Sequence, residues 1–335
     1  MSHLLARLKL SLNKLGSIKR DAALENLSAK KIWRKLAALA IVTASLFYIV
    51  NELQGNISTD AFARKTPSLT DALGLTLGCL GTLLLSTLYH VQIMKNIRRS
   101  NVHGLFLANA YSLGQIVRYL PGKVFGILFH VSMLKTQSSA RDVVAALSIQ
   151  TVSDYIWAAF YCGSLAIYLQ YGDIAFLLVV VVSLLAAQVY HGENFVQRAV
   201  LRVISMFGGA NSTELSHKLP RSKAVAMTTV LALVWVPLTL GFIFGYRDSF
   251  TAEESVIVAI CYIAAAMFSL FAFVVPSGIG IREALLIWLG GNFYIDSADL
   301  AYVAVTARLA LTAAEVGNAL VIHLIKRLDE MHWKW

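Results

Sequence analysis

The amino-acid sequence predicts an all-α, polytopic membrane protein with six full spans and two re-entrant helical hairpins arranged as an inverted repeat. Hydrophobic residues make up 57% of the 335 residues and charged residues only 14%, whereas a soluble domain carries about 25% charged residues. The apolar residues gather into blocks near the length of about 20 residues that a helix needs to cross about 30 Å of hydrocarbon. Two further apolar blocks are broken by proline and glycine. A soluble globular protein is therefore not expected.

The formal net charge of +10 reports orientation in a membrane, because the basic residues lie at the ends of the apolar blocks. Loops rich in Lys and Arg stay in the cytoplasm. The charge is therefore no evidence for a nucleic-acid partner. Cys79, Cys162 and Cys261 lie singly in apolar segments, so neither a disulfide framework nor a zinc site is predicted.

Residues 1–35 form a basic N-terminal segment in which leucines are interleaved with Lys and Arg. This pattern predicts an amphipathic helix on the anionic cytoplasmic leaflet. A solvated basic tail that only fixes the topology explains the pattern equally well. The segment lacks a compact apolar region followed by a small-residue cleavage site, so it is not predicted to be a secretory signal.

Continuous apolar blocks predict the full spans, at about 36–50, 72–94, 143–169, 174–190, 224–246 and 300–325. Two stretches, 102–134 and 255–291, are interrupted by the strings RYLPGK at 118–123 and PSGIGIRE at 276–283. Proline removes a helical hydrogen bond and glycine relaxes the backbone, so each stretch is predicted to turn back at membrane depth as two half-helices. A simple helix kink is the alternative.

Charged loops orient these elements. The basic connections belong in the cytoplasm: 1–35, 95–99, the loop with Arg141, the loop 191–223 and the tail 326–335. The opposite connections carry mostly acidic residues and belong outside, although Arg64, Lys65 and Arg247 weaken that signal. With six spans and two hairpins that return to the side on which they start, both termini are cytoplasmic.

The same order of elements occurs twice, in opposite orientation. The first repeat covers 36–169 with its hairpin at 102–134, and the second covers 174–325 with its hairpin at 255–291. The string YSL at 111–113 precedes the first break as FSL at 268–270 precedes the second. Inverted repeats with discontinuous helices at matching places are typical of transporters, whose substrate site lies near the midplane.

Charges inside the apolar blocks mark candidate sites, since a charged side chain at the bilayer centre costs about 2.5–3.5 kcal/mol. Arg118 and Lys123 flank Pro121 and Gly122. The break would expose backbone groups to a cavity, in which the two cations could hold a phosphate, Arg118 by paired hydrogen bonds and Lys123 as a point charge. The alternative is that Arg118 only caps the C-terminal end of its half-helix.

The second break predicts an anion site, because Ser277, Gly278 and Gly280 lead into a half-helix with free backbone N–H groups. Glu283 suits the helix dipole, whereas Arg282 opposes it. A cation in this unfavourable position suggests that Arg282 has a ligand or an acidic partner. Helix packing explains the glycines equally well.

Asp154, Arg308 and Glu315 are candidates for gating or coupling. Asp154 lies near the middle of its span, and Arg308 and Glu315 lie seven residues apart on one face of the last span. An Asp154–Arg308 pair across the pseudo-twofold axis would neutralise two costly charges. Such a pair could equally be structural.

No catalytic motif is present: there is no GxSxG, HExxH or Walker loop. An enzyme is therefore not expected, and no catalytic residue, cofactor or metal site is predicted. His90, His130 and His191 have no partner at metal-ligand spacing and are predicted to be packing or interfacial residues. Without a nucleotide site, energy for transport must come from ions, the membrane potential or the lipid gradient.

The strings RYLPGK at 118–123 and VPSGIGIREALL at 275–286, in this order in a basic multi-spanning chain, resemble the lysylphosphatidylglycerol synthase transmembrane-region family. The resemblance covers about 36–325. It implies a bacterial or archaeal cytoplasmic membrane and translocation of lipids between leaflets, with the two motifs at the heart of the site. Two-part members of that family carry a soluble aminoacyl-transfer domain that this sequence lacks, so lysyl transfer is not carried over.

The expected function is a flippase-like lipid translocase that moves a phospholipid or glycolipid headgroup through a midplane site. The alternatives are an ion-coupled transporter of a small soluble solute, a membrane-embedded lipid-modifying transferase with Asp154 or Glu283 as general base, and a non-transporting scaffold. The expected partners are membrane lipids with an anionic or zwitterionic headgroup. Biosynthetic enzymes of a surface lipid or glycan and a second copy of the chain are further candidates.

Overall fold

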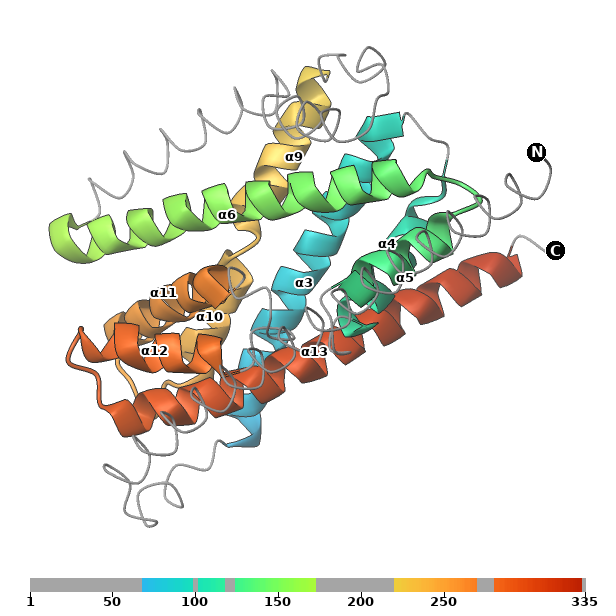
Figure 1. Ribbon diagram of the computed structural model, residues 1–335. Helices are drawn as coiled ribbons and strands as arrows, with labels where there is room; N and C mark the ends of the chain where they lie inside the picture. Colours follow the sequence, from blue (N-terminus) through green and yellow to red (C-terminus); the bar gives the residue numbers. More distant parts are fainter. Residues whose placement is uncertain (1–67, 99–101, 118–123, 173–219, 270–279, 333–335) are drawn as a thin grey trace, which may run out of the picture.

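A computed structural model describes residues 68–98, 102–117, 124–172, 220–269 and 280–332 (Figure 1). In these residues the chain forms α-helices and no strand. The helices are α3 (Leu69–Arg98), α4 (Gly104–Val117), α5 (Val124–Leu134), α6 (Ala140–Tyr171), α9 (Arg221–Leu233), α10 (Val236–Gly245), α11 (Ala252–Ser269), α12 (Ile281–Gly291) and α13 (Ser297–His332).

Five helical segments are long and apolar enough to cross a membrane: Leu69–Ile97, Ala140–Tyr171, Arg221–Gly245, Ala252–Ser269 and Ser297–Asp329. They confirm the prediction of an all-α, multi-spanning protein. Four of them match the spans predicted at 72–94, 143–169, 224–246 and 300–325. The spans predicted at 36–50 and 174–190, and the N-terminal segment 1–35, lie outside the described residues.

α3 carries an exposed apolar stripe. It consists of Leu73, Leu77, Leu84 and Leu88, and Leu77 is 62% exposed and Leu88 46% exposed. A continuous exposed stripe of this kind is unusual in a monomeric protein in water. Lipid tails, which are as apolar as leucine, cover it at no cost.

Polar side chains cap the starts of α6 and α13. The side chain of Ser139 accepts a hydrogen bond from the backbone N–H of Asp142 at 3.1 Å, and the Asp142 carboxylate accepts one from the backbone N–H of Ser139. Asp296 accepts a hydrogen bond from the backbone N–H of Ala298 at the start of α13. Such caps satisfy N–H groups that have no partner within the helix.

The span Arg221–Gly245 is kinked. It consists of α9 and α10, with the break at Val234 and Trp235 and a proline, Pro237, in the first turn of α10. Proline lacks the N–H that would continue the helical ladder. The sequence predicted one continuous span here, and the structure places a bend within it.

α3 and α10 cross at a contact made of backbone. Gly78 lies against Gly241, and a Cβ atom added at Gly78 would come within 2.6 Å of the Gly241 Cα and 2.5 Å of the Pro237 carbonyl oxygen. Gly245 lies against Leu75 in the same way. Small residues four apart let membrane helices approach this closely.

Two helix pairs, α4 with α5 and α11 with α12, lie on opposite sides of α3 (Figure 1). The members of each pair pack against each other, and the segments between them lie outside the described residues. α4 packs against α13 and α5 against α6, while α11 packs against α6 and α12 against α13. α11 is longer than the predicted half-helix, since its 18 residues extend over about 27 Å.

The two short pairs are followed by matching segments. α5 and α12 each have 11 residues, and each is followed by a five-residue connection, 135–139 and 292–296, to a long helix. The interval from the end of α5 to the end of α12 is 157 residues (134 to 291), and so is the interval from the start of α6 to the start of α13 (140 to 297).

Candidate functional site

The structure describes half of the predicted site residues. Arg118, Pro121, Gly122, Lys123, Ser277 and Gly278 lie outside the described residues. The described members are Gly280, Arg282, Glu283, Asp154, Arg308 and Glu315. Five of these six lie on α12 and α13 or at the start of α12, and Asp154 lies on α6.

Gly280 and Glu283 form the start of α12. The backbone of Gly280 has φ 83°, a conformation that favours glycine. Its N–H donates a 2.7 Å hydrogen bond to Oε2 of Glu283. Glu283 was predicted to be favourable at this N-terminus, and its carboxylate caps the helix by accepting this hydrogen bond.

Arg282 is buried beside an aromatic ring. It is 7% exposed, its guanidinium carbon lies 5.0 Å from the centre of the Tyr262 ring, and its Nη2 lies 3.8 Å from Oε1 of Glu283. The ring and the carboxylate both favour the cation. Nε and Nη2 of Arg282 have no hydrogen-bond partner in the described part of the chain. Arg282 thus has the predicted acidic neighbour and retains free donors.

Arg308 and Glu315 extend this site along α13. Tyr262 lies within electrostatic range of Arg282, Glu283 and Arg308, and Cys79 lies within range of both Arg282 and Glu315. Glu315 is buried. We call Arg282, Glu283, Arg308 and Glu315 the charge cluster. Its two cations and two carboxylates balance, which lowers the cost of holding charge inside an apolar bundle.

Asp154 belongs to a different region. No ion pair between described residues joins it to Arg308. Its Oδ1 atom is buried and has no hydrogen-bond partner among the described residues. Asp154 lies one helical turn after Gln150 on α6, so the two side chains share a face.

Gln150 is the centre of a buried polar cluster that the sequence analysis missed. Its amide contacts the Ser86 carbonyl, the Ser86 hydroxyl, the Tyr111 hydroxyl and Nδ1 of His90, at 2.7–3.2 Å. His130 lies beside the His90 ring, with 5.0 Å between ring centres. One pattern in the sequence could have predicted this cluster. Two apolar spans each carry a pair of polar residues four positions apart, Ser86 with His90 and Gln150 with Asp154.

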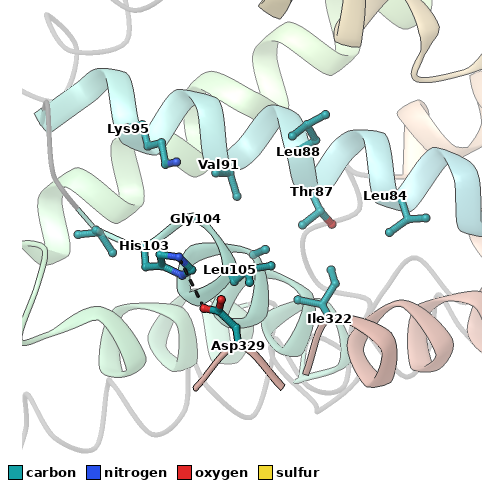
Figure 2. Close-up of a pocket in the computed structure, with 12 residues that line it drawn as sticks. Leu84, Thr87, Leu88, Val91, Lys95, His103, Gly104, Leu105, Ile322 and Asp329 are labelled. Atoms are coloured by element: carbon teal, nitrogen blue, oxygen red, sulfur yellow. Dashed lines mark ion pairs between the residues drawn. The ribbon is translucent and has the colours of Figure 1, made fainter. Parts of the chain in front are cut away.

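A groove of about 800 Å³ lies between α3, the start of α4 and the end of α13 (Figure 2). Its wall along α3 contains the exposed leucines Leu84 and Leu88, so the groove adjoins the apolar stripe. Ala108 of α4 and Ile322 of α13 complete the apolar part. The groove is therefore open along the exposed apolar surface of α3.

Polar side chains gather at one end of the groove, near the last turn of α3. His103 and Asp329 form an ion pair at 3.7 Å (Figure 2). The Lys95 ammonium lies over Gly104, within 3.1 Å of where a Cβ atom at Gly104 would lie. No carboxylate of the described residues forms an ion pair with Lys95. The excess of basic residues in cytoplasmic loops predicts that this end faces the cytoplasm.

Polar groups on α13 connect the groove with the charge cluster. Asn318 lies one turn after Glu315, and its Nδ2 donates to the hydroxyls of Thr87 and Ser112 at 3.3 and 3.2 Å. Thr87 also lines the groove. A row of polar side chains thus runs along the interface of α3 and α13.

Comparison with known proteins identifies no relative: no family model, no curated protein and no solved structure matches the chain. The resemblance to the lysylphosphatidylglycerol synthase transmembrane-region family stays a prediction, and the geometry above is the basis for a function.

Proposed function

We propose that the chain is a lipid translocase of a bacterial or archaeal cytoplasmic membrane, with both termini in the cytoplasm. The groove between α3, α4 and α13 carries this proposal, because it is polar at one end and apolar along its length and it opens sideways. A phospholipid or glycolipid likewise has a polar headgroup at one end and apolar acyl chains. Its headgroup would contact Lys95 and His103 while an acyl chain lies along Leu84 and Leu88.

The volume of the groove fits part of a lipid. Ligand sites commonly measure about 300–1,000 Å³ and are lined by apolar side chains with a few polar groups that fix orientation. The groove has both properties. Its open side leaves acyl chains in the bilayer, so only the headgroup needs a protein-lined path.

The charge cluster is the second part of the proposed path. A phosphate-bearing headgroup could be received by the free donors of Arg282, since guanidinium groups bind phosphate through paired hydrogen bonds. The polar row of Glu315, Asn318 and Thr87 leads from the groove to this cluster. The predicted motif residues Arg118, Lys123 and Ser277 would add to the same path.

An inverted repeat would supply the alternating access that a translocase needs. Three observations support it. The pairs α4·α5 and α11·α12 make corresponding contacts with α13 and α6. The segments after them match in length. α3 and α10 run antiparallel at the glycine crossing, since Gly74 lies near Phe244 and Gly81 near Pro237.

The rival functions fit these features less well. A carrier of a soluble solute needs a cavity closed to lipid, whereas this groove is open sideways. A transferase needs a carboxylate in an aqueous pocket at the interface, and the groove contains neither Asp154 nor Glu283. A scaffold predicts that changes to the groove and the charge cluster have no effect on lipid movement.

The test is leaflet exchange of fluorescent lipids in proteoliposomes. The variants are Lys95→Ala, Leu88→Trp, Arg118→Ala and Arg282→Ala, with Lys135→Ala as the control because Lys135 is an exposed lysine outside the groove. We expect the native protein and the control to exchange one headgroup class fast. Leu88→Trp should fill the groove and slow exchange about tenfold or more, as loss of about 1.4 kcal/mol of transition-state stabilisation would.

Two outcomes would count against the proposal. If folded native protein exchanges no lipid in a panel of anionic, zwitterionic and glycosylated headgroups, the chain is not a translocase of such lipids. If exchange is fast but none of the four variants changes it, the path has been assigned to the wrong residues.

A further inference from the structure

The buried polar cluster around Gln150 lies apart from both the groove and the charge cluster, and the proposed function does not use it. It is formed by Ser86 and His90 of α3, Tyr111 of α4, His130 of α5 and Gln150 of α6. His90 is 0% exposed and His130 is 1% exposed. Two imidazoles buried side by side in an apolar bundle need an explanation beyond packing.

The hydrogen bonds fix the proton on His90. The Ser86 carbonyl can only accept, so the amide group of Gln150 that faces it at 3.2 Å is the NH₂ group. The other end of the amide, Oε1, faces His90 Nδ1 at 2.7 Å and can also only accept. His90 therefore carries a proton on Nδ1. In the neutral ring, Nε2 is then a bare acceptor.

Each imidazole has one nitrogen without a partner among the described residues. Nε2 of His90 and Nε2 of His130 are both buried and have no hydrogen-bond partner in the described part of the chain. Tyr111 stacks on the His90 ring, with ring centres 4.3 Å apart and an angle of 17° between the planes. Buried polar atoms are normally paired, so two neighbouring unpaired nitrogens indicate a ligand.

We propose that His90 and His130 form a binding site for one proton, which couples proton movement to the lipid transport proposed above. A proton from water adds to the Nε2 lone pair of one imidazole, which becomes an imidazolium with an N–H donor. The second imidazole stays neutral, because two positive rings 5.0 Å apart in an apolar bundle repel strongly. Release to water on the other side returns the pair to its neutral state.

Burial in an apolar bundle opposes a positive charge on either ring. The Tyr111 ring face that stacks on His90 offsets part of this cost, and Asp154 on α6 is hydrogen-bonded to Gln150, the partner of His90. On α13, which packs on α3 and α4, His323 is paired with Asn109 and Glu315 belongs to the charge cluster. α10 carries no titratable residue. Arg221 and Lys223 of α9 are exposed.

The position of the pair links it to the moving parts of the proposed translocase. His130 and Tyr111 lie on α5 and α4, the two helices of the first predicted hairpin, and Gly114 lies near Gly126 and His130 where these helices meet. α4 also forms one wall of the groove through Gly104, Leu105 and Ala108. A charge that appears between α4, α5 and α3 therefore changes the packing of a helix that shapes the groove.

The first experiment measures the proton directly. Protein labelled with ¹⁵N-histidine is reconstituted in liposomes, and imidazole nitrogen shifts are recorded by solid-state NMR across a pH titration. Signals of the 8 histidines are assigned with His90→Gln and His130→Gln. We expect one ring of the pair to become protonated and the other to stay neutral. If both rings keep neutral shifts at every pH at which the protein is folded, the proton site is disproved.

The second experiment separates this inference from the proposed function. Lipid exchange is measured against pH in native protein, His130→Gln and the control His323→Gln, whose imidazole contacts Asn109 and does not line the groove. The native rate should change with pH by up to about tenfold per unit, the slope for one proton, and His323→Gln should keep this slope. His130→Gln should exchange lipid at a rate that no longer depends on pH. A His130→Gln profile like that of native protein overturns the coupling, whereas absence of exchange in all three proteins overturns the proposed function instead.

Discussion

At the scale of single residues, one glutamine holds together side chains from three helices. Gln150 of α6 contacts Ser86 and His90 of α3 and Tyr111 of α4. Gln150, His90 and Tyr111 are buried, so water molecules cannot replace these hydrogen bonds if they are lost. Gln150 fixes the orientation of His90 and ties the first short pair to the long helices.

Replacement of Gln150 by leucine should destabilise the protein. The change removes these contacts and leaves the His90 Nδ1–H without its partner. We expect a loss of about 1–3 kcal/mol, measured as a lower thermal unfolding midpoint in detergent. Gln137→Leu is the matched control, because Gln137 is exposed in the connection 135–139. Equal midpoints for the two variants would show that the cluster adds nothing to stability.

The sequence predicted single charges better than it predicted contacts. Arg282 was expected to have a ligand or an acidic partner, and Glu283, the next residue in the chain, lies 3.8 Å from it. A charge inside an apolar block is visible in one segment alone. The contact of His90 with Gln150 joins residues 60 positions apart, and a pattern within either segment does not contain that information. The histidines were therefore predicted only as packing or interfacial residues.

At the scale of helices, the crossing of α3 and α10 depends on the absence of side chains. Gly78 and Gly241 allow the two backbones to touch, and the same helix α3 also packs against α4, α6, α9 and α13. A displacement at this crossing would therefore change the packing of helices in both halves of the bundle.

Replacement of Gly78 by alanine should cost stability, because the new methyl group would lie 2.5 Å from the Pro237 carbonyl oxygen. Overpacking of this kind costs about 1–3 kcal/mol. Gly163→Ala on α6 is the control, since nothing lies within 4 Å of a Cβ atom there. That change should be neutral or stabilise by up to about 1 kcal/mol through helix propensity. Thermal unfolding midpoints that move in the same direction would contradict the close crossing.

Hydropathy and length predicted most of the described helices, because both properties are local to one segment. The kink before Pro237 was not predicted. Membrane helices tolerate proline when neighbouring helices satisfy the freed backbone groups, so a proline alone does not show where a span bends. The length of α11 was also not predicted. A break at 276–283 indicates where a helix ends, but the helix before it can be of any length up to a full span.

At the scale of the whole molecule, the matching connections 135–139 and 292–296 distinguish an inverted repeat from a parallel one. An inverted repeat puts them on opposite sides of the membrane. The basic residues Lys135 and Arg141 predict a cytoplasmic position for the first, and Asp296 and Asp299 predict an exterior position for the second.

Cysteine labelling in intact bacterial cells tests this arrangement. The native Cys79, Cys162 and Cys261 are first replaced by alanine, and Thr136→Cys or Phe293→Cys is then introduced in an exposed position of each connection. An impermeant maleimide should label Phe293→Cys in intact cells and Thr136→Cys only after the membrane is opened. Labelling of both from the same side would exclude the inverted repeat.

The glycine crossing has a mechanical consequence for the whole molecule. Interlocked side chains resist the rolling of one helix over another, but two bare backbones touching near Gly78 and Gly241 resist it little. If one half of the bundle rocks against the other about this crossing, residues near it would move least, and the ends of α3 and α13, where the groove lies, would move farthest.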